Sequence, residues 1–357
     1  MKRKWTNEEA NAWYKKAGWL RGCNFIGSNC TNRLDMWQSY KKDEKLAVAD
    51  KELELAHRIG FNTVRLWANF DVYYEEPESF MDILEEYLSL CKKHGQKVMM
   101  VLGYEEDLPR GDIFKPKNLG KQQYALGEHQ GRFPMTEEEK ALVPHHYLEY
   151  TETRDKFIEM VKRIVRKYRD DERIICWNVW NEPGIECGAR AVGFLDTLFD
   201  IVRAEDPIQP LCADIWRGLE NGKPRSEEET HALELSDVIS FHCYSDYQWF
   251  VESIYELKKL NRPIFVTEWL HRINHNNVNE IYPLLFIENI ANYCWGFVVG
   301  KTQTHEPWDI LWDQYESGER TDYDFTKWQH DLFRPNLRPY DPKEIELIKH
   351  FNKLADS

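Results

Sequence analysis

The sequence predicts a single (β/α)8 barrel, a closed sheet of eight parallel strands in which each strand is followed by a helix. Eight short runs rich in apolar and β-branched residues alternate with stretches that repeat apolar residues at helical spacing. The connections are short on one side of this alternation and long on the other. We expect one barrel domain over residues 1–357, with a short helical extension over about residues 1–20.

An open, doubly wound sheet is the competing arrangement. Such a sheet usually carries a glycine-rich phosphate loop after its first strand, and no Gly-x-Gly-x-x-Gly or Walker-type loop stands at that place. The unusual polar residues also follow strands 1 to 4 and 6 to 8, which spreads them around a ring. Both observations favour the barrel.

The first half of the chain carries clear signals for helix ends. Thr6 and Glu9 form the capping box of a short first helix. The helix expected at residues 46–59 is followed by Gly60, which suits a left-handed cap. Further helices are expected at residues 80–91 and 157–168. The strands of this half are expected at residues 21–28, 61–70, 96–104 and 174–184.

A long irregular segment, residues 104–150, follows the third strand, and loops of this length usually form functional walls or lids. The last helix, at residues 340–354, begins with Asp341 as its cap and Pro342 at its first position. The other helices of the second half are expected at residues 194–202, 227–235, 250–260 and 281–292. Its strands are expected at residues 210–216, 237–245, 263–272 and 294–302.

The composition excludes some partners. A formal net charge of -14 argues against binding a nucleic acid, which calls for clustered Lys and Arg. No run of about 18 apolar residues is present, so we expect no membrane span, and the first residues lack the apolar core of a signal peptide. The expected location is cytoplasmic, with export as the alternative if a leader has been removed. The oligomeric state is not predicted.

The eight cysteines are spread along the chain, and none forms a Cys-x-x-Cys pair. Several fall inside expected strands, where they read as small buried hydrophobic residues. We therefore expect free thiols and no structural zinc. The strand cysteines are Cys23, Cys176, Cys212, Cys243 and Cys294.

Two glutamates stand at the carboxyl ends of buried strands. Glu182 lies in an Asn-Glu-Pro triplet after the fourth strand, and Glu268 ends the apolar run of the seventh. One such residue is more often a solvated rim residue, but a pair facing each other across a barrel mouth suits hydrolysis of a glycosidic bond. Strands 4 and 7 should bring the carboxyl groups to about 5–5.5 Å, the separation of a retaining mechanism.

These motifs resemble the retaining clan A glycoside hydrolases, notably family five, over nearly the whole chain. The similarity is narrower to bacterial proteins commonly labelled 1,4-β-xylanases, or cellulase-like and family-five-like enzymes. The segments that carry it are GCNFI, DMWQ, GFNTVR, NEPG, DVISFH, GKTQT, PWD and YDPKEIELIK. The resemblance implies a carbohydrate or glycoside substrate, Glu182 as acid/base and Glu268 as nucleophile.

Four further polar residues match the family pattern. The resemblance implies that Arg65 and the pair His242 and Tyr244 hold the nucleophile and line the first sugar subsite. Arg65 would keep Glu268 ionised, while Glu182, which feels that charge, would keep its proton. Asn181 can donate to the sugar 2-hydroxyl. Taken alone, Arg65 could merely bridge interior carboxylates and His242 could be a satisfied core residue.

Aromatic side chains in loops after strands offer flat faces on which sugars stack. Trp37, Trp67 and Trp308 are the candidates, with Trp308 the best platform. The family usually places a Trp at the end of strand 8, whereas the strand expected here ends near Lys301. We therefore expect Lys301 or its neighbour Gln303 to make polar contacts there.

Two other functions remain open. The chain could be a carbohydrate-binding barrel that has lost its chemistry, which the intact glutamate pair argues against. It could also be a metal-dependent barrel hydrolase that uses His242, but no His-x-His follows strand 1 and no His-Glu-x-x-His occurs. We expect no metal and no cofactor. Long walls at residues 104–150 and 301–330 favour a pocket and terminal cleavage of short or aryl glycosides.

Overall fold

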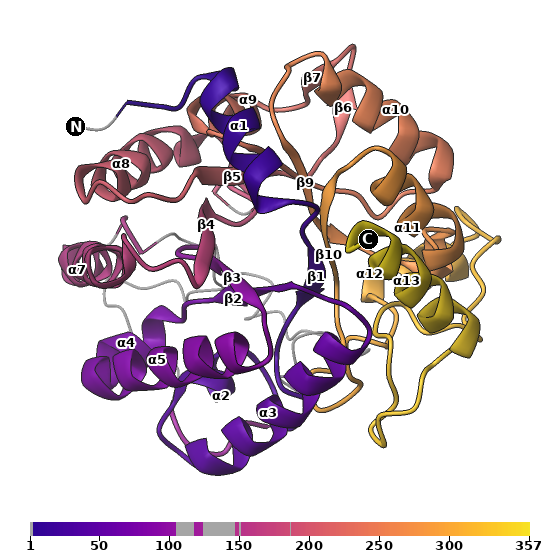
Figure 1. Ribbon diagram of the computed structural model, residues 1–357, viewed down its shortest axis with the longest axis horizontal. Helices are drawn as coiled ribbons and strands as arrows, with labels where there is room; N and C mark the ends of the chain where they lie inside the picture. The colour runs from indigo at the N-terminus through magenta and orange to yellow at the C-terminus, as the bar shows by residue number, and fades with distance from the viewer. Residues whose placement is uncertain (1–2, 105–117, 124–146, 150, 186) are drawn as a thin grey trace.

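A computed structural model describes residues 3–104, 118–123, 147–149, 151–185 and 187–357. Eight parallel strands close into a barrel in the order β1-β10-β9-β8-β5-β4-β3-β2, which confirms the predicted fold class (Figure 1). A two-stranded hairpin, β6 (Leu219–Glu220) and β7 (Lys223–Pro224), lies outside it. The barrel strands are β1 (Arg21–Asn24), β2 (Thr63–Trp67), β3 (Lys97–Val101), β4 (Ile174–Trp180), β5 (Leu211–Ile215), β8 (Ile239–His242), β9 (Ile264–Trp269) and β10 (Ala291–Cys294).

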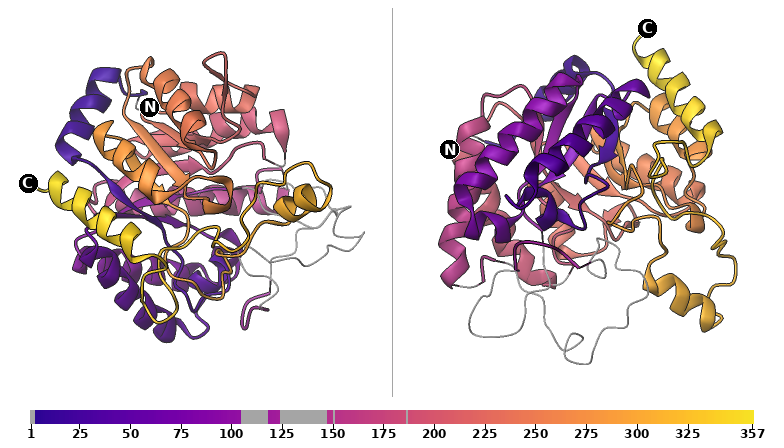
Figure 2. Two further views of the ribbon diagram at one scale, coloured as in Figure 1. Left: turned by 90° about the vertical axis from the view of Figure 1, so that its right-hand side faces the viewer. Right: turned by 90° about the horizontal axis from the view of Figure 1, so that it is seen from below.

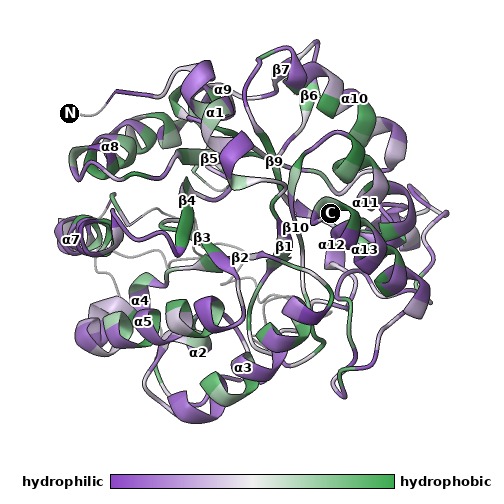
Figure 3. Ribbon diagram, in the orientation of Figure 1, coloured by the Kyte–Doolittle hydropathy of each residue, from purple (hydrophilic) through white to green (hydrophobic). Residues whose placement is uncertain are grey.

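Helices surround the barrel and turn their apolar faces toward it, as the green inner and purple outer faces of several helices show in Figure 3. No helix among the described residues is long and apolar enough to span a lipid bilayer. The helices are α1 (Asn7–Ala17), α2 (Arg33–Trp37), α3 (Lys42–Arg58), α4 (Phe70–Glu75), α5 (Pro77–Lys93), α7 (Thr151–Tyr168), α8 (Ala191–Ala204), α9 (Glu227–Leu235), α10 (Tyr247–Lys258), α11 (Val278–Ile287), α12 (Asp309–Glu316) and α13 (Pro342–Ala355), with short 3-10 turns η2 (Gly188–Arg190) and η3 (Arg272–Asn274).

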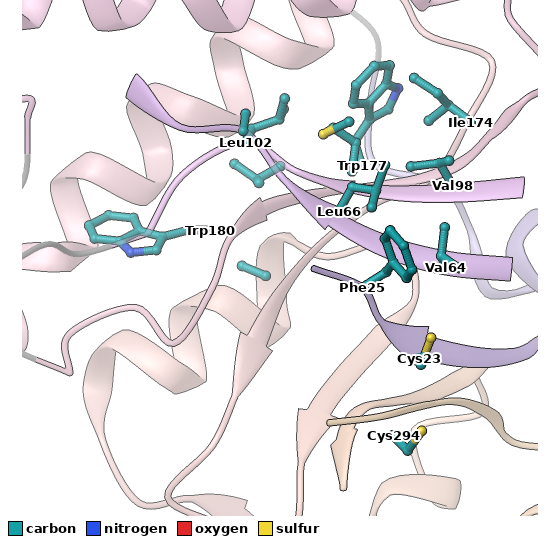
Figure 4. Close-up of a cluster of buried hydrophobic side chains, with 14 of the residues drawn as sticks. Cys23, Phe25, Val64, Leu66, Val98, Leu102, Ile174, Trp177, Trp180 and Cys294 are labelled. Carbon is teal, nitrogen blue, oxygen red and sulfur yellow. The ribbon is translucent and has the colours of Figure 1, made fainter. Parts of the chain in front are cut away.

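Alternation along the strands separates the core from the site. Val64 and Leu66 of β2 pack with Val98 of β3 in the layer between strands and helices (Figure 4). Arg65 lies between these two residues in the sequence, so its side chain points to the opposite face, into the barrel. A strand that reads as apolar in sequence can therefore carry one buried charge inward.

Helix α1 closes the amino-terminal end of the barrel. Its capping box is present, because the Thr6 side chain accepts from the Glu9 backbone N–H and Glu9 accepts from that of Thr6. Its aromatic side chains pack under the strands, where Trp13 stacks on Phe265 of β9 with ring centroids 6.2 Å apart. With this end filled, the open end is the one at which the strands finish, as in other barrels of this type.

The eighth strand differs from the prediction. It is β10, Ala291–Cys294, and not residues 294–302. The preceding helix α11 ends at Ile287, five residues earlier than expected, because Asn289 takes a left-handed conformation with φ 54°. The apolar run after Cys294 resembles a strand in sequence, but it forms the loop that leaves the barrel. The other seven strands lie within the ranges that the sequence predicts.

The long connection after β10 contains α12 and returns to the barrel at α13. In Figure 2, α12 projects at the end of the molecule opposite to the C-terminus. Arg272 ties this connection down, since it donates to the backbone oxygens of His330 and Asp331 and pairs with both carboxylate oxygens of Glu344. The other expected wall, residues 104–150, lies mostly outside the described residues.

Candidate active site

Glu182 and Glu268 meet at the carboxyl end of the barrel. Glu268 is the fifth residue of β9, and Glu182 follows β4 by two residues. One carboxylate oxygen of each lies within 4.8 Å of the other residue's. Glu182 has φ 45°, a left-handed conformation that is uncommon and costly for a residue with a side chain. The geometry brings together the two carboxylates that the sequence singled out.

Arg65 lies at the centre of the cluster and is completely buried. Its Nη1 donates to Glu268 Oε1 at 2.8 Å and to Asn24 Oδ1 at 2.9 Å. Its Nη2 donates to Asn181 Oδ1 at 2.7 Å and to Asp214 Oδ2 at 2.8 Å. The Asn181 amide oxygen already accepts a hydrogen bond from Arg65. The group of Asn181 that can bind a sugar hydroxyl is therefore its Nδ2 donor.

Glu268 is held by several donors. The Tyr244 hydroxyl donates to Oε2 at 2.8 Å, on the other side of the carboxylate from Arg65. Burial raises the pKa of Glu268, while His242, Arg65 and the Tyr244 hydroxyl pull it back toward its ordinary range. Burial also raises the pKa of Tyr244 well above its usual value, so this residue keeps its proton and acts as a donor.

His242 bridges the two glutamates. Its Nδ1 lies 2.6 Å from Glu182 Oε1 and 3.5 Å from Glu268 Oε2, and its Nε2 lies 3.5 Å from Asp214 Oδ2. Burial lowers its pKa, but the charges of Glu268, Asp214 and Glu182 outweigh burial and raise the pKa to about 10. His242 therefore carries a positive charge at neutral pH, and it is a member of the site and not an isolated core residue.

Asp214 on β5 belongs to the same cluster, and the sequence reading missed it. The interior of such barrels is usually filled by branched apolar residues, yet here the layer beneath the glutamates is polar. Asp214 is completely buried and accepts from Asn178, Ser240 and Thr267 besides Arg65. Burial works against its charge, but Arg65 and His242 hold its pKa well below the usual range. A charged residue inside an otherwise apolar strand was the one available signal.

An aromatic cluster beside the two glutamates is formed by Trp67, Tyr104 and Trp295, all of them buried, so that a substrate contact by Trp67 stays a prediction. The Trp67 ring centroid lies 5.7 Å from that of Tyr104 and 5.4 Å from that of Trp295. Trp295 directly follows β10, so a Trp does stand at the end of strand 8. The expected departure from the family pattern was wrong, because it rested on the misplaced strand.

Trp37 is not a substrate contact. Its side chain has no exposed surface, its Nε1 donates to the Trp67 backbone oxygen at 2.6 Å, and its ring packs against Phe80 and Tyr87. It is a core residue. The sequence pattern predicts a loop after β1 here, whereas Trp37 is the last residue of the short helix α2, which turns its ring into the core.

Trp308 lies beside the site, partly exposed. Its ring meets that of Tyr244 edge to face, with centroids 5.2 Å apart, and it also contacts His271 and His330. Its role as a sugar platform stays a prediction. The Lys301 side chain is exposed and its backbone N–H donates to the Ser28 oxygen, while Gln303 is buried. A substrate contact by Lys301 is likewise a prediction.

Glu182, His242 and Glu268 are also the group best placed to hold a metal ion among the described residues. To do so, His242 would have to lose its proton and its hydrogen bond to Glu182. The charge of Arg65, 2.8 Å from Glu268, would oppose a second cation. The donor set therefore fits proton transfer better than metal binding.

Comparisons with known proteins agree with the barrel fold. No curated protein sequence matches the chain significantly. Solved structures share the fold at low identity: an exo-β-1,4-mannosidase from an Opitutaceae bacterium has 15% identity and a TM-score of 0.59 over 95% of this chain. This chain spans 61% of that protein's length.

Two other solved structures are similar. An endo-β-1,4-mannanase from Thermotoga petrophila has 16% identity and a TM-score of 0.56, over 94% of this chain and 77% of the other. A family 5 glycoside hydrolase from Streptomyces cattleya, solved with Manβ1-4GlcNAc, has 11% identity and a TM-score of 0.60, over 94% and 80%. The family model described as cellulase (glycosyl hydrolase family 5) matches residues 21–295. The chain therefore belongs to glycosyl hydrolase family 5.

Proposed function

We propose that Glu268 is the nucleophile and Glu182 the general acid/base of a β-glycosidase that acts on short oligosaccharides or small glycosides. The observation that carries this proposal is the pair of carboxylates at the carboxyl ends of β4 and β9, with oxygens no more than 4.8 Å apart. This separation leaves little room for a water between them and a bound sugar. It favours direct attack by a carboxylate.

The surroundings of the two glutamates support the division of roles. Glu268 is buried between the Arg65 guanidinium and the Tyr244 hydroxyl, which both stabilise its anion. The Glu182 side chain is more exposed, at 18% against 7%, and it contacts His242. A nucleophile needs a fixed, ionised carboxylate, whereas an acid/base must reach both the leaving oxygen and an incoming water.

The chemistry follows from this placement. The Glu268 carboxylate attacks the anomeric carbon while Glu182 gives its proton to the departing glycosidic oxygen, which leaves as an alcohol. Glu182 then takes a proton from water as that water attacks the same carbon and frees Glu268. Two inversions give a product with the configuration of the substrate. We expect the Asn181 Nδ2 to donate to the sugar 2-hydroxyl in both transition states, because the amide oxygen accepts from Arg65.

β-Mannosides are the first substrates to test, since the solved structures that share the fold include a mannosidase and a mannanase. Trp67 and Trp295 lie beside the cluster with 5% and 7% of their surface exposed, and we expect the edges that stay accessible to contact one sugar ring. The test is hydrolysis of aryl β-mannosides, β-glucosides and β-xylosides, and of β-1,4-linked di- to hexasaccharides, with and without a chelator. Hydrolysis that is indifferent to chelator and lost in Glu268→Gln is expected. Activity abolished by chelator would contradict the proposal.

We also propose that the protein works in a reducing compartment. Support comes from the eight cysteines, all of which are buried and none of which forms a disulfide. Cys176 and Cys212 lie with their sulfurs 3.7 Å apart on neighbouring strands and are not joined.

A further inference from the structure

We propose that Asp214 is a positioning residue of the active site: it holds Arg65 and His242 in the orientations in which they face Glu268 and Glu182. This role rests on the proposed assignment of the two glutamates. Asp214 itself lies one layer deeper than the glutamates, on β5, and has no exposed surface. It acts on the reaction through its two cationic neighbours.

The first contact is with Arg65. The guanidinium divides its donors, with Nη1 directed to Glu268 and Nη2 directed to Asp214, both at 2.8 Å. Asp214 thereby shares the positive charge that would otherwise act on Glu268 alone. It also helps to fix the plane of the guanidinium, because hydrogen bonds from its two terminal nitrogens to two different carboxylates leave it little rotational freedom.

The second contact is with His242. Asp214 Oδ2 faces Nε2 at 3.5 Å while Glu182 faces Nδ1 at 2.6 Å, so the ring lies between two carboxylates. Asp214 makes no hydrogen bond to Nε2, so it acts on the ring through its charge: it favours the protonated imidazolium, whose Nδ1–H can donate to Glu182. The charged and titratable groups that face His242 are Glu182 after β4, Asp214 on β5 and Glu268 on β9, with Arg65 on β2 and Tyr244 behind them.

The carboxylate is itself well fixed. Asn178 Nδ2 lies 2.8 Å from both of its oxygens, Thr267 Oγ1 donates to Oδ1 at 3.0 Å, and Ser240 Oγ also donates to Oδ1. These donors come from β4, β9 and β8, so they join the strands that carry Glu182, Glu268 and His242. A buried anion with this many partners stays ionised in spite of its burial.

Asp237 provides a matched control. It is also a completely buried Asp, it pairs with the Arg203 guanidinium at 3.2 Å, and it accepts from the backbone N–H groups of Trp5 and Leu211. It precedes β8, at the amino ends of the strands, far from the glutamates. Asp237→Asn should therefore lower the free energy of unfolding, as Asp214→Asn should, but leave the contacts of His242 and Arg65 unchanged.

The test is the titration of His242, followed by NMR of the full chain with isotope-labelled histidine and assigned with His242→Asn. Loss of the neighbouring negative charge in Asp214→Asn should lower the His242 midpoint by about one pH unit or more. Asp237→Asn should leave the midpoint unchanged. An unchanged midpoint in Asp214→Asn, or an equal fall in Asp237→Asn, would overturn the proposal. Asp214→Ser is the second variant if the Asn variant does not fold, with the same shift expected.

Activity gives a separate readout. With any substrate that the wild-type protein hydrolyses, Asp214→Asn should move the acid limb of the kcat/KM profile to lower pH. In this variant the Arg65 charge is no longer shared with a second carboxylate, and one nearby negative charge is removed. Both changes lower the pKa of Glu268. An acid limb at the wild-type pH would count against the role. A wild-type protein inactive on all substrates would refute the proposed function, whereas the His242 titration would still decide the role of Asp214.

Discussion

Glu268 and Glu182 differ in what surrounds them, and the proposed division of roles rests on this difference. Arg65 and Tyr244 donate to opposite sides of Glu268, whereas Glu182 faces His242 and solvent. Substitution by glutamine keeps the shape of each side chain and removes its acid–base and nucleophilic chemistry. The two variants should therefore fail at different steps of the retaining mechanism.

With 2,4-dinitrophenyl glycosides, whose leaving group needs no acid, Glu182→Gln should still form the glycosyl-enzyme, seen as a burst of released phenolate. Glu268→Gln should release none. On natural oligosaccharides both variants should lose most of their turnover, roughly 10³-fold or more. Equal and complete loss of the burst in both variants would contradict the assignment of roles.

The pKa of Glu268 sets the acid limb of the pH profile. Burial raises this pKa, so activity should fall with decreasing pH at a higher pH than for an exposed glutamate. Tyr244→Phe removes a donor that favours the anion, which raises the pKa further and should move the acid limb to higher pH by roughly one unit. Tyr282→Phe is the control, because its hydroxyl donates to Asn352 away from the site. A limb that moves down in Tyr244→Phe would refute this account.

At the level of elements, the sequence was most informative where local signals act. The capping box of α1, the glycine after α3 and the apolar spacing of α7 each depend on neighbouring residues, and each is present in the structure. Strand β10 was misplaced because its four residues include the polar Asn292, while the longer apolar loop after it looks more like a buried strand.

The candidate site could be predicted only in part for a similar reason. Glu182 and Glu268 stand at strand ends, a position that sequence pattern reveals. The role of Asp214 depends on its contacts with Arg65, Ser240 and Thr267. These residues come from three other strands and contact Asp214 only in the closed barrel. The burial of Trp37 likewise depends on contacts with α5 that no local pattern specifies.

The connection after β10 contains a buried acid that should make stability depend on pH. Burial raises the pKa of Asp331 to about 7, although the Thr304 hydroxyl and Arg272 oppose this rise. A carboxyl whose pKa is higher in the folded than in the unfolded state stabilises the fold at low pH. The free energy of unfolding then falls as the pH rises from the unfolded-state pKa near 4 to the folded-state pKa. Glu52, with a pKa of about 7, acts in the same direction.

Asp331→Asn should therefore raise the free energy of unfolding above pH 7, by on the order of 2–4 kcal/mol, and change it little below pH 4. Asn also suits this position, where φ is 64°. Urea unfolding at pH 4, 6 and 8 measures the effect. A variant that is destabilised at pH 8 as much as at pH 4 would contradict the assignment of a raised pKa.

For the whole molecule, the chain is a member of glycosyl hydrolase family 5 that folds as a (β/α)8 barrel. Its amino-terminal end is closed by α1, so substrate must enter at the carboxyl ends of the strands. The eight buried cysteines carry no structural crosslink in this fold. Stability then comes from the packed layer between strands and helices.

Thiol counting tests the proposed reducing compartment. Natively produced protein, denatured without reductant, should show all eight thiols, and the folded protein should react slowly because each thiol is buried. Four or fewer reactive thiols after denaturation would indicate disulfides and an oxidising compartment.

The most direct test of the central claim is to trap the covalent intermediate. A 2-deoxy-2-fluoro glycoside with a dinitrophenyl leaving group, made with the best sugar found in the substrate panel, should inactivate the enzyme with release of one phenolate per chain. Mass spectrometry of the digested protein should then place the added sugar on Glu268. A label on Glu182, or on any other residue, would contradict the account.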